Sequence, residues 1–430
     1  MASAESAPGP GARRLAVFAV APGIFLAALA LGETGASARM TLADALALAE
    51  QQNPSLKARA QAIESSRAAE VTAGLRPNPT FQNDTTSATL GVYQEIEVGG
   101  KRRARLESAR LATSMSQTDF ADARRTLVYN VRQAFVGALL GKANAALARE
   151  NLTTFGKVVD LNRLRFESGA LSGADLQRIE LQMLQFQTDL EEASVALDTA
   201  KATLRALLGG SLVPEDFDVE GELEATPFEK TLPELERLAL ANRPDLRSAE
   251  TEVQKAAADF RLARANGYPD PTIGTSLLHT GNEVGGPSWF QPFYPKGETS
   301  NAMGLGISFP LPVFNRNQGE IARTSSEQRR AQFLAEATRN QVVQDVDSAY
   351  AAFQSSRERV RWYEQTYLSR AKDSRDTAEF AYEKGATSAL ELLDAERTYR
   401  ATELAYRREL AAYETNLAQL DAAVGKAVIP

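Results

Sequence analysis

The amino-acid sequence predicts a mainly α-helical protein with a membrane β segment, in which long helical hairpins are duplicated and each chain carries four β-strands. Three observations predict this fold. Proline and glycine recur in the same order in the two halves of the sequence. The stretches between them are long and almost free of helix breakers. Two short stretches alternate between apolar residues and small or polar ones.

The first 38 residues have the pattern of a secretory signal peptide. Arg13 and Arg14 supply the positive charge, residues 15–31 form an apolar run, and Ala-Ser-Ala at 36–38 fits a cleavage site. The alternative is a transmembrane anchor, for which the run is only marginally long. We therefore predict an exported protein whose mature chain starts at Arg39.

The mature chain consists of two repeats. We assign residues 39–210 to repeat 1, 211–230 to a linker, 231–425 to repeat 2 and 426–430 to a tail. Each repeat is expected to hold a short first helix, two strands and a long helical hairpin. The matching segments are NPSL at 53–56 with RPDL at 243–246, AGLRPNPT at 73–80 with ANGYPDPT at 265–272, and FESG at 166–169 with YEKG at 382–385.

Long helices are predicted over residues 102–168 and 320–384, which contain no proline. Such helices would run on the order of 100 Å at about 1.5 Å per residue. Their apolar stripes are narrow and rich in alanine, which favours coiled-coil contacts between neighbouring helices. Return helices are predicted over 174–208 and 388–424, so each repeat forms an antiparallel hairpin.

Each hairpin turns at a glycine, Gly169 in repeat 1 and Gly385 in repeat 2. Ser172 and Ser388 follow the turns and are predicted to cap the return helices.

The strands are predicted between the first helix and the long helix of each repeat. Pro77 and Pro269 begin the proline pairs that end the first helices. One strand is expected over residues 90–98, and a clearer one over 303–313, where every second residue is apolar. This pattern is typical of a membrane barrel strand. The alternative is a strand of a soluble sandwich, but export, duplication and the small number of strands favour the membrane.

Four strands are too few to close a barrel. The chain must therefore associate with other copies to pair its sheet edges. A trimer would supply a 12-stranded β-barrel and would gather the long helices into an α-helical barrel.

The composition argues against several classes of function. A net charge of −7 gives no electrostatic basis for nucleic-acid binding. The chain has no cysteine, and His279 is its one histidine, so a thiolate or histidine metal site is excluded. No carboxylates form a paired acid–base set. We predict no enzyme activity, no cofactor and no resident metal. The aromatic residues within 281–300 fit either an interfacial girdle or loop packing.

These features resemble the TolC-type outer-membrane efflux family, and the resemblance covers residues 39–425. The motifs QEIEVGGKR at 94–102 and ISFPLPVFNRNQGEI at 307–321 are similar to its CzcC-like branch, which serves cobalt–zinc–cadmium resistance. The resemblance implies a homotrimeric duct in outer-membrane lipid that extends into the periplasm. It also implies two partners, a periplasmic adaptor (membrane fusion) protein and an inner-membrane RND pump.

The resemblance also implies a periplasmic gate at the second hairpin tip. Glu391 and Asp394 would lie on the lumen side, where three copies of each would form anionic rings. Tyr382 occupies the place of a gate tyrosine in the family. Thr387 stands where some relatives carry an arginine of a closing ion pair, so this chain departs from that latch. The alternative for the two carboxylates is an ordinary solvated helix face.

The hairpin tips are expected to meet the adaptor, and the alternative is that these residues only shape the turns. The residues concerned are Gly169, Leu171, Ser172, Gly385, Thr387 and Ser388.

The predicted function is passive export of heavy-metal cations. Two alternatives remain open. The first is a duct of the same fold for drugs, organic solutes or type I protein secretion. The second is a soluble periplasmic coiled-coil scaffold with no barrel.

Overall fold

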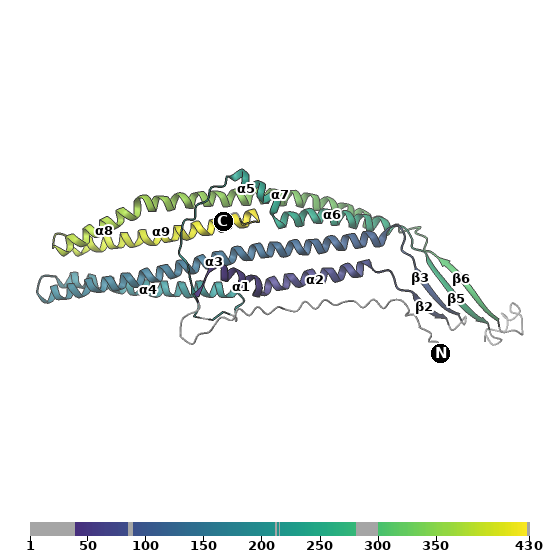
Figure 1. Cartoon of the computed structure of the whole chain (residues 1–430), viewed down its shortest axis with the longest axis horizontal. Coiled ribbons are helices and arrows are strands. Elements are labelled where there is room, and N and C mark those ends of the chain that lie inside the picture. The colour runs from purple at the N-terminus through teal and green to yellow at the C-terminus, as the bar shows by residue number, and fades with distance from the viewer. Residues whose placement is uncertain (1–38, 85–88, 211–212, 215, 281–299, 428–430) are drawn as a thin grey trace, which may run out of the picture. The chain divides into compact units, whose positions relative to one another are not determined.

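The computed structural model describes residues 39–84, 89–210, 213–214, 216–280 and 300–427 (Figure 1). The predicted signal peptide and the aromatic residues of 281–299 lie outside the described residues.

The same series of elements occurs in each half of the described chain. Repeat 1 contains α1 (Leu42–Gln52), α2 (Pro54–Gly74), β2 (Thr80–Asp84), β3 (Thr89–Glu95), α3 (Lys101–Glu167) and α4 (Gly173–Leu207). Repeat 2 contains α5 (Leu232–Asn242), α6 (Pro244–Ala265), β5 (Thr272–Thr280), β6 (Ser300–Ser308), α7 (Gln318–Trp362), η3 (Tyr363–Tyr367), α8 (Leu368–Glu383) and α9 (Ala389–Val424). Two short strands, β1 (Arg39–Met40) and β4 (Asp218–Val219), pair in parallel and fix the linker to the segment that precedes α1.

The two repeats contribute to one antiparallel sheet with the strand order β2-β3-β5-β6. The apolar alternation predicted from the sequence is present, and its apolar face is open to solvent in the single chain: Leu305 is 85 % exposed. On the other face the ring of Tyr93 lies against Gly91 and Gly274, where a Cβ atom at Gly274 would stand 2.2 Å from the ring. These glycines therefore make room for the Tyr93 ring.

Two strands end earlier than the sequence predicted. Strand β3 stops at Glu95 instead of residue 98, and β6 stops at Ser308 instead of residue 313. Pro310 and Pro312 explain the second difference, since a proline has no N–H to donate to a neighbouring strand.

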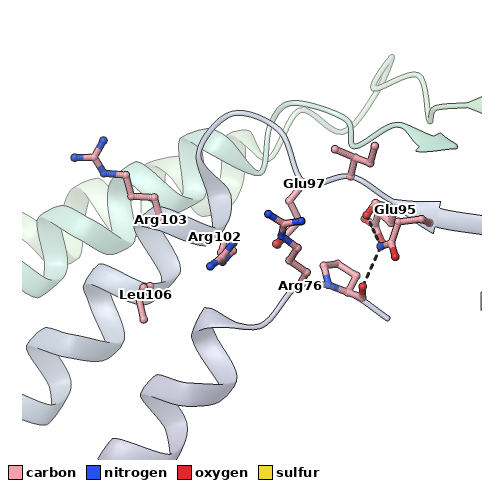
Figure 2. Close-up of a pocket in the computed structure, with 9 residues that line it drawn as sticks. Arg76, Glu95, Glu97, Arg102, Arg103 and Leu106 are labelled. Carbon is pink, nitrogen blue, oxygen red and sulfur yellow. Dashed lines mark hydrogen bonds between the residues drawn. The ribbon is translucent and has the colours of Figure 1, made fainter. Parts of the chain in front are cut away.

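The junction between the sheet and the helices is held by buried and half-buried ion pairs. Lys101 Nζ lies 2.6 Å from Asp270 Oδ2, which ties the start of α3 to repeat 2. Arg105 pairs with Glu97 and also donates to Leu75 O at 3.0 Å. A cavity at this junction is lined by arginines, by Glu95 and Glu97, and by a few apolar side chains (Figure 2).

The long helices are as extended as the sequence predicted, with one difference. Helix α3 is continuous over 67 residues. The corresponding stretch of repeat 2 is divided by the π-helical segment η3 between α7 and α8. A single α-helix over 320–384 was therefore the wrong expectation. Neither the spacing of apolar residues nor the positions of proline and glycine predict a π segment, because the residues that form it are ordinary helix residues.

The first helix of each repeat is two helices rather than the single helix expected. Asn53 and Arg243 share one backbone conformation, φ −59° and ψ 121°, and each is followed by a proline in the first turn of the next helix. The residue before a proline is pushed out of the helical region, which breaks the helix at this point.

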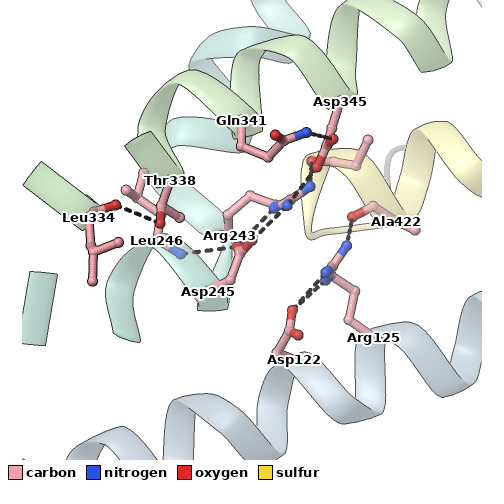
Figure 3. A network of polar contacts seen from close by, with 11 residues as sticks. Asp122, Arg125, Arg243, Asp245, Leu246, Leu334, Thr338, Gln341, Asp345 and Ala422 are labelled. Carbon is pink, nitrogen blue, oxygen red and sulfur yellow. Dashed lines mark hydrogen bonds and ion pairs between the residues drawn. The ribbon is translucent and has the colours of Figure 1, made fainter. Parts of the chain in front are cut away.

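Arg243 is the centre of a polar network that joins three helices of repeat 2 (Figure 3). Its guanidinium binds Asp245 at 2.6 Å and Asp345 at 2.9 Å, and it donates to Ala423 O at 3.1 Å. Burial alone would raise the pKa of Asp245, but the Arg243 guanidinium outweighs burial and holds that pKa below its ordinary value.

The hydrophobic core lies where each hairpin packs against its own first helices. The core of repeat 1 gathers around Val131, Phe135 and Leu204, and that of repeat 2 around Val346, Phe353 and Leu420. In the helical layer α3 lies between α2 and α6, and α6 lies beside α7 (Figure 1). Among the described helices, none combines the length and the apolar character needed to cross a membrane.

Candidate functional site

The two hairpin tips are built by the same backbone chemistry. Gly169 and Gly385 have φ of +77° and +71°, in the left-handed region that favours glycine. At each turn a peptide N–H reaches back across the end of the long helix at 2.8 Å, from Ala170 to Arg165 O and from Ala386 to Ala381 O. The turn geometry predicted at both glycines is therefore present.

Both predicted serine caps are also present. The Ser172 hydroxyl accepts from Asp175 N at 3.1 Å, and the Ser388 hydroxyl accepts from Glu391 N at 3.3 Å. Each satisfies a peptide N–H that a helix start otherwise leaves free.

The tips of the two hairpins pack against each other within one chain. A small core of buried apolar side chains joins α3 and α4 to α8 and α9, and the rings of Phe155 and Phe186 are 4.7 Å apart in it. Ala389 and Leu392 enter this core from the start of α9. Leu171 is half-buried against it, whereas Gly169, Ser172, Gly385 and Ser388 are exposed at the turns.

Tyr382 is buried between the two hairpins. Its hydroxyl donates to Asn162 Oδ1, and Asn162 Nδ2 donates to Val158 O at 2.7 Å. Asn162 is fully buried, with 0 % exposure. The Arg165 guanidinium lies over the Tyr382 ring, 5.1 Å from its centre, and donates to Glu383 O at 3.4 Å. Asn162 and Arg165 were not singled out from the sequence, because nothing in their own helix shows that another hairpin faces them.

The two predicted gate carboxylates lie on the first turns of α9 and are exposed. Glu391 lines a surface groove together with Asp373, Ser374 and Thr377 of α8, and Asp394 lies outside that groove. Thr387 also lines the groove, and its hydroxyl is buried without a hydrogen-bond partner in the described part of the chain. The structure thus brings Thr387 and Glu391 together and leaves Asp394 one turn further along.

A charged cluster follows on the next turn of α9. Burial raises the pKa of Glu396; Arg375 and Arg400 oppose this effect, and Glu379 and Asp376 add to it. Arg400 also forms an ion pair with Asp189 of α4 at 2.7 Å and lies over the Phe186 ring. This pair links the return helices of the two hairpins.

The family model for outer membrane efflux proteins matches residues 27–210 and 235–426, which is most of the chain. The chain belongs to this outer membrane efflux protein family. The predicted membership of the TolC-type family is confirmed, and so are the location in the outer membrane and the fold class of helical hairpins with a β segment.

The curated relatives of this outer membrane efflux protein are named for different solutes. The cobalt-zinc-cadmium resistance protein CzcC of Cupriavidus metallidurans is 26 % identical over 84 % of this chain and 84 % of its own length. The pyoverdine export outer membrane protein OpmQ of Pseudomonas aeruginosa is 25 % identical over 80 % of this chain and 69 % of its own.

Solved structures share the fold of this efflux protein. A structure of CusC superposes with a TM-score of 0.73 at 20 % identity and covers 90 % of this chain and 92 % of its own. The Campylobacter jejuni CmeC outer membrane channel superposes with a TM-score of 0.73 at 16 % identity and covers 89 % and 85 %. At such identities the likeness concerns the fold.

Proposed function

We propose that three copies of this protein form a passive duct through which heavy-metal cations leave the cell. The duct would act with a periplasmic adaptor and an inner-membrane RND pump, and it would catalyse no reaction. Energy and choice of substrate would come from the pump.

One observation carries the proposal: a sheet with an exposed apolar face stands at the end of helices far longer than those of an ordinary globular domain. Met303, Leu305 and Ile307 alternate along one face of β6 with glycines and alanine on the other. An apolar face suits lipid, and a face of small and polar residues suits a wet lumen. A soluble scaffold gives no reason for this exposed face, which disfavours that alternative.

The sheet also explains why more than one copy is needed. Among the strands that the structure describes, β2 and β6 each pair with one other strand, so each presents an unpaired edge. Backbone groups left without partners are costly in lipid. Pairing β6 of one copy with β2 of the next would remove both edges, and three copies would give twelve strands.

The gate is proposed at the tip of the second hairpin. Glu391 and Asp394 are exposed and lie three residues apart, on one side of α9. In a closed trimer their carboxylates would form anionic rings that repel one another in a narrow aperture. Tyr382 would act inside each chain, where its bond to Asn162 holds the second hairpin against the first.

The adaptor is proposed to bind the turns. Exposed peptide groups around Gly169 and Gly385 offer a similar surface in both hairpins, so one adaptor segment could recognise either tip. The residues proposed for this contact are Gly169, Leu171, Ser172, Gly385, Thr387 and Ser388.

Heavy-metal cations are the proposed cargo because CzcC is named for cobalt-zinc-cadmium resistance and CusC for cation efflux. CzcC also matches this chain over the larger share of both lengths. The second candidate cargo is an organic solute, favoured by the similarly identical pyoverdine exporter OpmQ.

The deciding experiment is a deletion strain that is complemented with the wild-type gene and challenged separately with cobalt, zinc, cadmium and an exported siderophore. We expect lower tolerance of at least one metal and full rescue. Unchanged metal tolerance together with lost siderophore export would replace the metal proposal by the organic one.

For the gate, the double variant E391A/D394A is expected to conduct more ions in planar bilayers and to be blocked less by divalent cations. Unchanged conductance and block would remove both residues from the aperture.

A further inference from the structure

Phe314 stands out among the exposed apolar residues. It is 92 % exposed, more than any other large apolar side chain in the described part of the chain. It lies in the motif at 307–321, between the end of β6 and the start of α7. The alternation of β6 does not account for it. The apolar residues Leu305, Ile307 and Phe309 follow one another at every second position, and Phe314 falls out of step with this series.

The turn that carries Phe314 is held in place by several hydrogen bonds. Gln318 Nε2 donates to Phe314 O at 3.2 Å, and Val313 N donates to Leu311 O at 2.8 Å. Asn317 has φ of +63°, and its side chain donates to Ala263 O of α6 at 2.7 Å. An aromatic side chain on a fixed turn loses little freedom on binding, which is the property of a good interface anchor.

A second exposed apolar surface lies at the other edge of the chain. Val71 and Leu75, at the end of α2, are 66 % and 60 % exposed. The backbone here is also fixed, since Arg102 donates to Gly74 O at 2.8 Å and Arg105 to Leu75 O at 3.0 Å. The cavity of Figure 2 adjoins this surface, and it is lined by Arg76, Pro77, Ile96 and Leu106 among others.

The two surfaces lie at opposite edges of the chain, so the surface of one copy could meet the other surface of the next copy. The sheet runs β2-β3-β5-β6, and the helices run α2, α3, α6, α7 in the same direction. Strand β6 runs toward the helices and β2 runs away from them, so pairing the two edges across copies would be antiparallel. Residues 309–314, which follow β6, would then lie beside residues 75–79, which precede β2.

We infer that Phe314 of one copy seats on Leu75, Val71 and the stem of Arg76 of the next copy, as the apolar anchor between neighbouring chains at the junction of sheet and helices. This contact rests on the proposed trimer. Leu75 and Val71 supply apolar contact, and the Arg76 guanidinium supplies a cation for the face of the ring. The contact gives the motif at 307–321 a role in assembly, beside the strand that precedes it.

The absence of cysteine from the sequence makes the contact easy to test by cross-linking. The double variant Leu75→Cys/Phe314→Cys is purified in detergent and oxidised, and covalent species are counted on denaturing gels. We expect covalent dimers and trimers from the double variant and none from either single variant. Leu75→Cys combined with Leu390→Cys is the control, because Leu390 is similarly exposed but lies at the far tip of the second hairpin.

The mass of the assembly, measured before oxidation, distinguishes failure of the proposed trimer from failure of the Phe314 contact. Monomers of the wild-type protein would overturn the proposed trimeric duct and the contact with it. Wild-type and variant trimers without a cross-link would overturn the contact alone. In that case lipid is the other occupant, and quenching of Phe314→Trp fluorescence by brominated lipids would demonstrate it.

A second measurement does not depend on oxidation. Phe314→Ala is expected to speed dissociation of the detergent-solubilised trimer about 30-fold or more, the effect of losing an interface hot spot. Phe309→Ala is the matched control from the same segment, since Phe309 continues the apolar face of β6, which faces lipid rather than the next copy in the proposed duct, and this variant is expected to leave the dissociation rate within about threefold of the wild type. Equal dissociation rates for the two variants would contradict the inference.

Discussion

The two halves of this chain share a backbone plan and differ in the chemistry placed upon it. Hairpin 1 (α3 and α4) contains one uninterrupted long helix, and hairpin 2 (α7 to α9) contains a π segment in the corresponding helix. Phe166 precedes the turn of hairpin 1 where Tyr382 precedes that of hairpin 2. Tyr382 is buried and its hydroxyl donates to Asn162 Oδ1, whereas Phe166 is exposed.

Charge at the tips differs in the same way. The position of Asp394 in hairpin 2 is held by Arg178 in hairpin 1, and Arg178 pairs with Asp175 at 3.3 Å. This ion pair within one helix turn balances the charge of Asp175, while Glu391 and Asp394 of the second tip are both exposed carboxylates. The comparison teaches that glycines and caps preserve the shape of the repeat, while the residues of the proposed gate differ from their counterparts in the first hairpin.

The π segment adds a polar contact that hairpin 1 lacks. Tyr406 of α9 donates its hydroxyl to Glu364 of the segment at 3.1 Å, and burial and this carboxylate raise the pKa of Tyr406 to about 12. The rings of Tyr363 and Tyr367 also meet edge to face within the segment. Such segments are frequent at functional positions in helices.

The largest difference in stability effect between equivalent substitutions in the two halves is expected at Asn53 and Arg243, where each first helix breaks. Asn53 and Arg243 occupy the same backbone position and donate to the end of a return helix, at Leu207 O and Ala423 O. Arg243→Ala leaves Asp245 and Asp345 without their cation and is expected to lower the free energy of unfolding by about 3–5 kcal/mol. Asn53→Ala removes a cap and a side-chain bond and is expected to cost about 1–2 kcal/mol. Urea unfolding followed by circular dichroism measures both, and equal losses would show that the charged network adds nothing to the cap.

Much of this plan could be predicted from the sequence because it depends on local chemistry. Gly169 and Gly385 specify left-handed turns, and Ser172 and Ser388 stand where a helix needs a side-chain acceptor. The long helices follow from the lack of proline. The breaks at Pro54 and Pro244 are equally local, since a residue before proline leaves the helical region, but the prediction of one first helix used these segments only as repeat markers.

The surroundings of the gate residues could not be predicted in the same way. The burial of Tyr382 depends on Asn162, which lies in the other hairpin, and no pattern within either helix encodes that meeting. The position of Glu391 in a groove depends on the distance between α8 and α9, which packing sets. Non-local contacts of this kind are decided by tertiary structure, and a single sequence carries little record of them.

The next largest effect is expected at the contact between the tips. Tyr382→Phe keeps the ring and removes the hydroxyl, which leaves the buried Asn162 amide oxygen without its donor. We expect a loss of about 1–3 kcal/mol in the free energy of unfolding. The matched change is Phe166→Tyr, which adds a hydroxyl at the exposed equivalent position and is expected to have no measurable effect. A loss from Phe166→Tyr as large as that from Tyr382→Phe would contradict the asymmetry between the tips.

Substitutions of the helix caps are expected to have the same effect in both hairpins. Ser172→Ala and Ser388→Ala remove one acceptor each from turns of the same geometry, and each is expected to cost about 1 kcal/mol. The thermal unfolding midpoints of the two variants should therefore decrease by the same amount. A much larger loss at Ser388 would mean that this serine has a second role beyond the cap.

The smallest expected effect concerns pH. The pKa of Glu396 is raised by burial, so the folded chain binds its proton more tightly than the unfolded chain does. Stability from this group is therefore fully present below the ordinary carboxyl pKa of 4.5 and declines as the pH rises through the raised value. Glu396→Gln should remove this decline and make the protein slightly more stable than the wild type at neutral pH.

Glu180 holds the equivalent position in hairpin 1 and provides the control, since its carboxylate pairs with Arg163 at 3.1 Å. Glu180→Gln removes that pair and is expected to weaken the fold slightly at neutral pH, opposite in sign to Glu396→Gln. Unfolding midpoints measured from pH 4 to pH 8 compare the two variants. If Glu396→Gln destabilised the protein at neutral pH, the attraction of Arg375 and Arg400 would outweigh burial. Glu396 would then belong to the ion pairs that hold the hairpins together, and would not act as a half-buried acid near the proposed gate.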